Sequence, residues 1–285
     1  MQLSDPGEQL QEIITHNVSS ETKKWIEEKL DRVISSTSAR ELYLSYSLLA
    51  GKIDNTKPLN VFDCDSEIAV FLGDRKANTL QVSRIYLLVR VLEENAEYFI
   101  PKVANLIQVA DTRELETFLT YLFLLPRAEA FKNVAVEALR TNIATVFDAI
   151  SLNNPYPAKY FNDQQWNQMY LKAAFMQRNL AEIEGVDSRA NKDLTRIISD
   201  YAHERWAASR DVDPLFWRPV SDFLEGELLD DMQRLLKSSD LCENRAAALC
   251  CYYSKLTAPR KLLENYPALQ EDVARKRVTW ENLIN

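Results

Sequence analysis

The sequence predicts an all-α protein, and three observations support this fold class. Glycine is scarce, with 5 residues among 285 against a usual share of ~7%. Because each glycine inside a helix costs about 1 kcal/mol, this scarcity favours helix. The 10 prolines lie mostly between segments of periodic apolar residues rather than inside them. Within those segments, apolar residues recur at the three- and four-residue spacings of one helix face.

The N-terminal part of the chain is expected to contain three helices followed by an irregular connection. The predicted helices cover about 6–18, 20–34 and 41–50. Gly51 follows the third and suits a helix C-terminus. Residues 52–78 hold Pro58, Gly73 and many Asp and Asn residues, with an apolar island at 68–72. They are interpreted as a long connection with one short helix, and a hairpin insertion is the alternative.

From Thr79 the apolar spacing becomes regular. Four helices are predicted, marked by the segments 82–92, 99–107, 115–122 and 128–142. Asp111 is expected to cap the third helix and Pro126 to end it. Helix pairs that repeat at roughly 35 to 45 residues are typical of HEAT or armadillo proteins. The predicted architecture is therefore an irregular α-solenoid of antiparallel helix pairs, in a single domain over 1–285. An irregular helical bundle is the alternative.

Residues 153–285 carry the motifs that matter most for function. Residues 153–157 read Asn-Asn-Pro-Tyr-Pro, which predicts a stiff turn because each proline fixes its own φ. Asn162 is followed three residues later by Gln165, a spacing typical of a capping box at a helix N-terminus. Further helices are predicted over about 162–176, 194–209, 227–237 and 240–255. Short helical turns in the remaining tail are expected to cap the end of the solenoid.

Composition narrows the classes of function and the compartment. The net charge is −8, with 42 acidic and 34 basic residues, which disfavours nucleic-acid binding because that relies on a basic face. The N-terminus lacks the basic and apolar regions of a signal peptide. The densest apolar run, 119–125, is far shorter than the ~18 residues of a membrane span. The cysteines form no disulfide framework and are expected to be reduced thiols: Cys64, Cys242, Cys250 and Cys251. A soluble, cytoplasmic protein is expected.

Motifs for catalysis and cofactor binding are sparse. The sequence contains no glycine-rich phosphate loop, no Gly-x-Ser-x-Gly and no His-Glu-x-x-His. Only two histidines are present, His16 and His203. Asp200, His203 and Glu204 share a helix face and could bind a metal or act as acid and base. A solvated helix face is the favoured alternative, so no catalytic residue, metal or cofactor is predicted.

The segment 154–172 offers the best candidates for binding. Prolines on both sides of Tyr156 would hold Tyr156 and Tyr160 in place before a partner arrives. One interpretation makes them the rim or floor of a binding groove, with Asn167 and Lys172 adding polar contacts. The other lets the aromatic rings fill a gap between helix pairs. For Trp166 and Trp206, packing in the core is favoured.

Three segments, 154–158, 166–173 and 200–206, resemble the EboA family of bacterial proteins. The resemblance implies a cytoplasmic protein encoded in the ebo gene cluster. That cluster also encodes a prenyltransferase-like membrane protein, a TatD-like hydrolase, a dehydroquinate-synthase-like protein and a sugar-isomerase-like protein. In cyanobacteria the cluster is implicated in moving a secondary-metabolite precursor to the periplasm. The family brings no established activity that could be assigned to individual residues.

Three functional hypotheses follow. The first is a non-catalytic binding or scaffold protein that supports processing or export of a secondary-metabolite precursor, with proteins of the same cluster as partners. The second is a carrier of an aromatic or isoprenoid metabolite, held near Tyr156, Tyr160, Asn167 and His203. The third is an enzyme that uses the carboxylates and the imidazole of residues 200–204. The candidate binding residues are Asn154, Tyr156, Tyr160, Asn167, Lys172, Asp200, His203 and Glu204.

Overall fold

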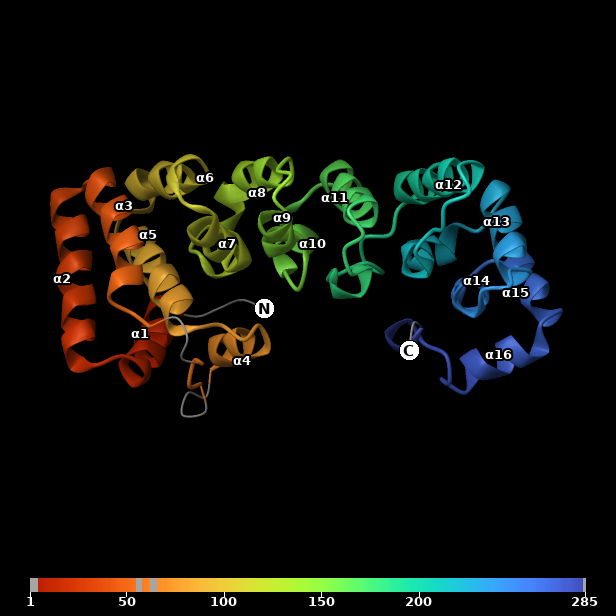
Figure 1. Ribbon diagram of the computed structural model, residues 1–285, viewed down its shortest axis with the longest axis horizontal. Coiled ribbons are helices and arrows are strands. Elements are labelled where there is room, and N and C mark those ends of the chain that lie inside the picture. The colour runs from red at the N-terminus through yellow and green to blue at the C-terminus, as the bar shows by residue number, and fades with distance from the viewer. Residues whose placement is uncertain (1–4, 55–57, 62–65, 284–285) are drawn as a thin grey trace. The chain divides into compact units, whose positions relative to one another are not determined.

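A computed structural model describes residues 5–54, 58–61 and 66–283 (Figure 1). These residues form sixteen α-helices and six 3-10 helices. Within the same ranges, β pairing is limited to one isolated antiparallel bridge between Pro58 and Asn78. None of the described helices is both long enough and apolar enough to cross a bilayer. The all-α prediction is confirmed.

The chain divides into two compact units, residues 1–150 and 151–285. The second unit begins close to residue 153, where the motif-bearing half was predicted to start. All eight candidate binding residues belong to it. The expected single domain stays a prediction, as does the stacking of antiparallel helix pairs into a solenoid.

The first unit contains nine α-helices among its described residues, and one of them has the N-cap that the sequence predicts. They are α1 (Pro6–Asn17), α2 (Ser20–Ser36), α3 (Ala39–Leu48), α4 (Glu67–Asp74), α5 (Thr79–Ala104), α6 (Leu106–Val109), α7 (Thr112–Thr120), α8 (Lys132–Ala138) and α9 (Ala144–Ser151). Three short 3-10 helices join them: η1 (Leu49–Gly51), η2 (Leu122–Leu124) and η3 (Ala128–Phe131). Asp111 caps α7, and its capping box with Glu114 is complete. The apolar island of the 52–78 connection forms α4, as predicted.

Two features of the first unit differ from expectation or lie beyond it. Helix α5 runs through two predicted helices, and their boundary survives as a kink at Asn95 (φ −149, ψ 78). The Asn95 side chain accepts the Tyr98 N–H at 3.1 Å, as a helix cap would. Pro101 lies inside the merged helix, in the second turn after the kink, although the segment 99–107 predicted it in the first turn of a new helix. Cys64, predicted to be a reduced thiol, lies outside the described residues.

A buried polar cluster ties α3, α5 and α7 together. Arg84 Nη2 lies 3.3 Å from Glu114 Oε1, and both side chains are almost fully buried. Arg84 Nε donates to the Tyr46 carbonyl at 3.4 Å, while the Tyr46 hydroxyl donates to the Glu114 carbonyl at 2.9 Å. Burial raises the pKa of Tyr46 far above its ordinary value. The charged pair is thus surrounded by hydrogen bonds, as a buried ion pair needs to be.

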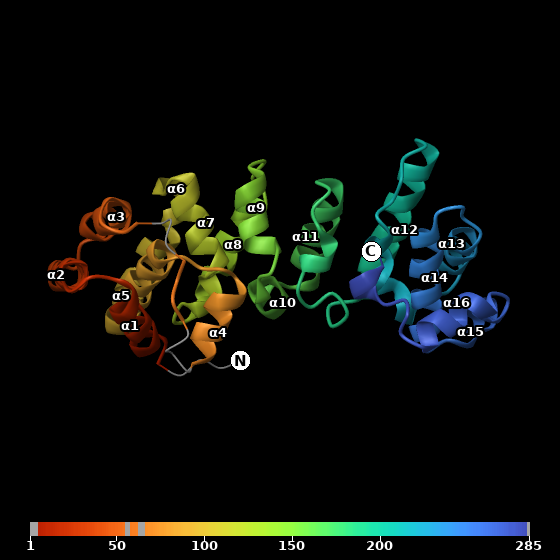
Figure 2. The same ribbon diagram turned by 60° about the horizontal axis from the view of Figure 1, so that its bottom comes forward.

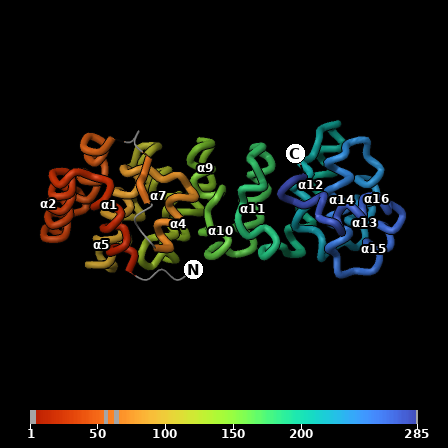
Figure 3. Tube along the Cα trace, turned by 90° about the horizontal axis from the view of Figure 1, so that it is seen from below, coloured from red at the N-terminus to blue at the C-terminus, as the bar shows by residue number. Residues whose placement is uncertain are grey.

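The second unit contains seven α-helices within the described ranges. They are α10 (Pro155–Tyr160), α11 (Asp163–Phe175), α12 (Lys192–Ala207), α13 (Glu227–Leu236), α14 (Leu241–Tyr253), α15 (Thr257–Glu264) and α16 (Pro267–Ala274). Three 3-10 helices accompany them: η4 (Leu180–Glu182), η5 (Pro214–Phe223) and η6 (Trp280–Asn282). Figures 2 and 3 show α13 to α16 clustered together, and α14 contacts η5, α13, α15 and α16. Residues 246–251 are fully buried there, and five of their six side chains are the small ones of Ala and Cys, which lets these neighbours approach closely.

The predicted Asn-Pro-Tyr-Pro turn is the first turn of a helix. Asn154 caps α10 by accepting the Tyr156 N–H at 3.0 Å, and Pro155 occupies the first helical position. Proline is tolerated there because the N–H it lacks would have no helical acceptor. Tyr156 is fully buried, with its ring centroid 4.7 Å from that of Tyr160. The prolines thus place Tyr156 in the core.

Candidate functional site

An amide pair joins α11 to the start of α12. Asn167 and Asn191 face each other, with Nδ2–Oδ1 distances of 3.1 and 2.9 Å. Asn191 also caps α12 by accepting the Leu194 N–H at 2.9 Å. With the Asn167 amide turned over, its nitrogen donates to the Asp163 carbonyl at 3.0 Å and its oxygen accepts the Leu194 N–H at 3.3 Å. In either orientation a buried, hydrogen-bonded amide lies between the two helices.

The segment that returns the chain from α11 to α12 is held by Arg189 and Gly185. Arg189 Nη1 donates to the Ala158 and Phe161 carbonyls, both at 2.9 Å, and so satisfies the C-terminal end of α10. Gly185 has φ +84, and a Cβ there would lie 2.7 Å from the Ala158 Cβ. A side chain at residue 185 would therefore push this segment away from α10.

A groove lies between the C-terminal halves of α11 and α12. Its volume is about 620 Å³, within the range of ~300–1,000 Å³ that is usual for small-molecule sites. Four lining residues fall on one stripe of α11 and three on one stripe of α12, and Arg210 follows the end of α12: Gln168, Leu171, Lys172, Phe175, Tyr201, Glu204, Arg205 and Arg210. Spacings of three and four residues place each set on a single helix face. The Asn167–Asn191 pair lies nearer the N-terminal ends of the same helices, so it fixes their spacing beside the groove.

The end of α12 brings two arginines to the groove. Ser209 adopts φ 54 just after the helix, and the Arg210 N–H donates back to the Arg205 carbonyl at 2.9 Å. This backbone turn ends the helix and returns residue 210 to the groove. Arg205 Nε donates to the Asp211 carbonyl at 2.9 Å, and its guanidinium carbon lies 5.9 Å from the centroid of the Tyr201 ring.

The charged groups of the groove are mainly cationic. Lys172, Arg205 and Arg210 carry positive charge, whereas Glu204 is the one carboxylate that lines the groove. This local excess opposes the net charge of −8 of the whole chain. Burial lowers the pKa of Lys172, because the ammonium loses hydration at the groove wall. Apolar surface comes from Leu171, Tyr201 and Phe175, whose side chain is 72% exposed.

His203 faces α13 and lies outside the set of groove residues. Its Nε2 lies 2.6 Å from Asp231 Oδ1, and its Nδ1 lies 3.3 Å from Glu227 Oε1. The buried Asp231 also accepts the Ser199 hydroxyl at 2.7 Å. The serine is bonded to the carboxylate rather than to the imidazole, so His203 does not activate it as a nucleophile. In the described ranges, no group of three or more His, Cys, Asp or Glu residues could hold a metal ion.

The candidate residues therefore occupy different places. Asn154 and Tyr156 pack within the core around α10, where Tyr160 is half-buried. Asn167 joins α11 to α12, His203 contacts α13, and Asp200 is exposed on α12. The two candidates that line the groove together are Lys172 and Glu204. Trp166 is fully buried as predicted, and Trp206 is half-buried between the Arg234 guanidinium, at 4.0 Å, and the Trp217 ring, at 5.7 Å.

Residues 7–221, about three quarters of the chain, match the family model described as "Metabolite traffic protein EboA". The chain belongs to the EboA family. The resemblance seen in the motifs is thereby confirmed, and the family description fits a metabolite-related role. No curated protein and no solved structure matches the chain. The matched range contains every residue of the groove and ends before α13, so the groove is part of the EboA region.

Six groove residues of this EboA protein were not among the predicted candidates: Gln168, Leu171, Phe175, Tyr201, Arg205 and Arg210. One signal for them exists in the sequence. Leu171 and Phe175 lie four residues apart, on the side of α11 away from the buried Trp166 and Ala173. An apolar pair on the polar side of a helix indicates a second contact surface. The partner stripe on α12 has no such local signal, because Tyr201 also fits the buried pattern.

Proposed function

We propose that this EboA protein is a non-catalytic metabolite-binding protein, and that the groove between α11 and α12 holds the metabolite. The supporting observation is the groove itself, whose volume of about 620 Å³ suits one small molecule. Its apolar residues can hold an aromatic or isoprenoid body, while its charged residues can fix an orientation. The proposal places the carrier hypothesis at Lys172 and Glu204 rather than near Tyr156, Asn167 and His203.

Binding without catalysis is favoured by the state of the one imidazole in the second unit. The Nε2 atom of His203 is hydrogen-bonded to the buried Asp231 carboxylate, and its Nδ1 atom lies 3.3 Å from the Glu227 carboxylate. Both ring nitrogens therefore face side chains of α13 rather than the groove, where a substrate would need a proton acceptor. Replacing His203 with Ala should therefore leave metabolite traffic in cells intact once stability is matched. Loss of traffic with unchanged stability would favour the enzyme hypothesis instead.

Co-purification of the natural ligand tests the binding proposal. The protein is purified from cells that make the metabolites of the gene cluster and is examined by native mass spectrometry. Gln168 is exposed at the groove, so Gln168→Trp fills the groove without disturbing the core. Lys192→Trp places the same ring on an exposed part of α12 and serves as the control. An added mass that disappears in Gln168→Trp alone supports the proposal, whereas one that persists in both variants contradicts it.

A role in an assembly is the second part of the proposal. The protein would deliver its ligand to other proteins of the ebo cluster for processing or export, with the prenyltransferase-like membrane protein as one recipient. This rests on the family description of metabolite traffic. Affinity purification from native cells, followed by mass spectrometry, should recover proteins of the cluster. A chain that elutes alone from such lysates would contradict this part while leaving ligand binding unaffected.

A further inference from the structure

The chemistry of the groove narrows the class of ligand. Three cationic side chains and one carboxylate surround the apolar surface of Leu171, Phe175 and Tyr201. We infer that the groove binds an amphiphilic organic anion, in which an apolar or aromatic body carries one carboxylate, sulfonate or phosphate group. This inference rests on the proposed function, since it names the ligand class for the same groove.

Charge complementarity carries the argument. The whole chain has a net charge of −8, so its summed charge repels an approaching anion. The groove presents the opposite sign, because Lys172 comes from α11 and Arg205 and Arg210 come from the end of α12. A cationic groove in an acidic protein attracts anions that the net charge of the protein repels, so it selects for anionic ligands.

The arginines have donors left for a ligand. Within the described part of the chain, the Arg205 side chain uses only Nε, which donates to the Asp211 carbonyl. Its two Nη atoms can pair with two oxygens of one anionic group. Arg210 sits beside it because the turn at Ser209 returns the chain to Arg205. Two guanidinium groups can therefore act on one head group.

The apolar residues account for the other part of the ligand. Phe175 is 72% exposed and sits one helical turn beyond Leu171, so a bound apolar body would cover both. The Tyr201 ring is fixed against Phe216, with centroids 5.2 Å apart, and offers a rigid face. A simple inorganic anion would leave this surface uncovered, which is why the inferred ligand is amphiphilic.

Two fluorescent probes that differ by one charge test the inference. The first is 8-anilinonaphthalene-1-sulfonate, and the second is N-phenyl-1-naphthylamine, which has the same aromatic body without the sulfonate. Each is titrated into the full chain and the dissociation constants are compared. The sulfonate should bind in a saturable manner and more tightly than the neutral probe. Added NaCl should weaken the binding of the sulfonate probe alone, because salt screens the attraction between charges.

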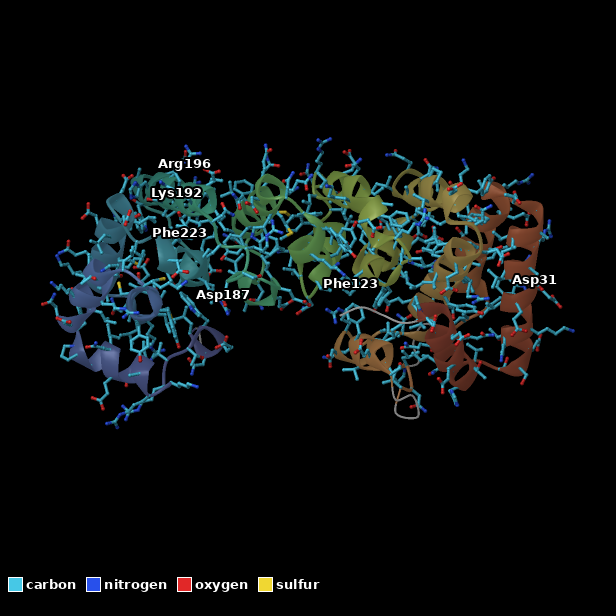
Figure 4. All side chains as sticks on the ribbon, turned by 180° about the vertical axis from the view of Figure 1, so that it is seen from behind. Asp31, Phe123, Asp187, Lys192, Arg196 and Phe223 are labelled. Atoms are coloured by element: carbon cyan, nitrogen blue, oxygen red, sulfur yellow. The ribbon has the colours of Figure 1, made fainter. Side chains whose placement is uncertain are left out.

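Charge-matched variants locate the effect. Lys172→Gln combined with Arg210→Gln removes two positive charges from the groove, and Arg205 is kept because it holds the turn. Lys192→Gln combined with Arg196→Gln removes the same charge from exposed positions on α12, where both side chains project outward (Figure 4). The groove variant should raise the dissociation constant of the sulfonate probe by about tenfold or more, because it loses at least one charge-assisted contact. The control should change it by no more than about twofold.

Two single variants and two competitors complete the test. Phe175→Ala should weaken the binding of both probes. Glu204→Gln should strengthen the binding of the sulfonate probe, because it removes the opposing carboxylate. Octanoate and octyl phosphate share an apolar tail, so displacement by one or both identifies the preferred head group. Displacement by neither contradicts the inference.

The outcomes separate this inference from the proposed function. Equal affinity for the two probes, or equal losses in the groove and control variants, overturns the preference for anions. If Phe175→Ala still weakens the neutral probe, the groove remains a binding site and only the ligand class is wrong. If neither Phe175→Ala nor the groove variant affects either probe, both the inference and the groove as a metabolite site fail.

Discussion

The amide pair between α11 and α12 makes a measurable prediction, because it holds the two helices that form the groove. The perturbation is Asn191→Ala, which removes the cap of α12 and the hydrogen bonds to Asn167. Loss of an N-cap costs about 1 kcal/mol of stability. Leaving the buried Asn167 amide short of a partner costs about 1–3 kcal/mol more. The expected total is about 2–4 kcal/mol, and it should fall toward the lower end because Asn167 can turn over and bond to Asp163.

Two further substitutions at the same position separate the cap from the bridge. Asn191→Ser keeps a good capping oxygen but is too short for the bridge, so it should lose only the bridge contribution. Asn191→Asp keeps the cap and can still accept a hydrogen bond from the Asn167 amide. The expected order of stability is therefore wild type, then Asp, then Ser, then Ala. A double-mutant cycle with Asn167→Ala should show a coupling energy of about 0.5–3 kcal/mol.

The assay is urea unfolding followed by tryptophan fluorescence. Of the five tryptophans, Trp25 belongs to the first unit, and the other four belong to the second. Fluorescence therefore reports mainly on the unit that contains the pair, while far-UV circular dichroism reports on the helices of both. If Asn191→Ser is as stable as wild type, the amide pair contributes nothing. If Asn191→Ala lowers the free energy of unfolding by less than about 0.5 kcal/mol, the helix cap contributes nothing measurable either.

Three other predictions concern buried groups. Replacing Arg84 with Met should destabilise the first unit by about 3–5 kcal/mol, because Glu114 is left buried and unpaired. Thermal unfolding should show that the double variant with Glu114→Leu regains most of the lost stability. Burial raises the pKa values of several tyrosines above the ordinary 10.0, among them Tyr46, Tyr121 and Tyr170. Since the unfolded chain releases these protons first, stability is complete below pH 10 and falls as pH rises further, and spectrophotometric titration should show late, cooperative ionisation. Iodoacetamide at neutral pH should label Cys242 well before Cys250 and Cys251. Burial raises the pKa of the Cys250 thiol above its ordinary value, and it raises the pKa of the Cys251 thiol to about 12. Equal labelling rates in peptide mapping would contradict this.

Much of the local structure could be predicted because its determinants lie within one helical turn. The capping box of Asn162 and Gln165 was predicted from a three-residue spacing, and both of its hydrogen bonds are present. Trp166, which was expected to pack in the core, lies on the buried face of α11. These features need no information from distant residues.

The interpretation of the proline-flanked tyrosine shows where local reasoning stops. The residues at 154–157 fix the backbone of either an exposed turn or a helix start, and both fit the same φ values. Burial of Tyr156 depends on its packing beside Phe161, with ring centroids 6.3 Å apart, and on Arg189 and Gly185 holding a later segment against α10. Residue types alone did not distinguish a binding rim from a packed ring.

By itself the sequence determined that the chain is helical, where most helices start and end, and that it belongs to the EboA family. Tertiary structure alone decided which polar and aromatic residues share a groove. The physical reason is that the groove requires two helix faces separated by a return segment of the chain, and their distance is set by contacts such as the Asn167–Asn191 pair. Such contacts have no fixed spacing in the sequence, so only folding brings Lys172 and Arg210 to the same site.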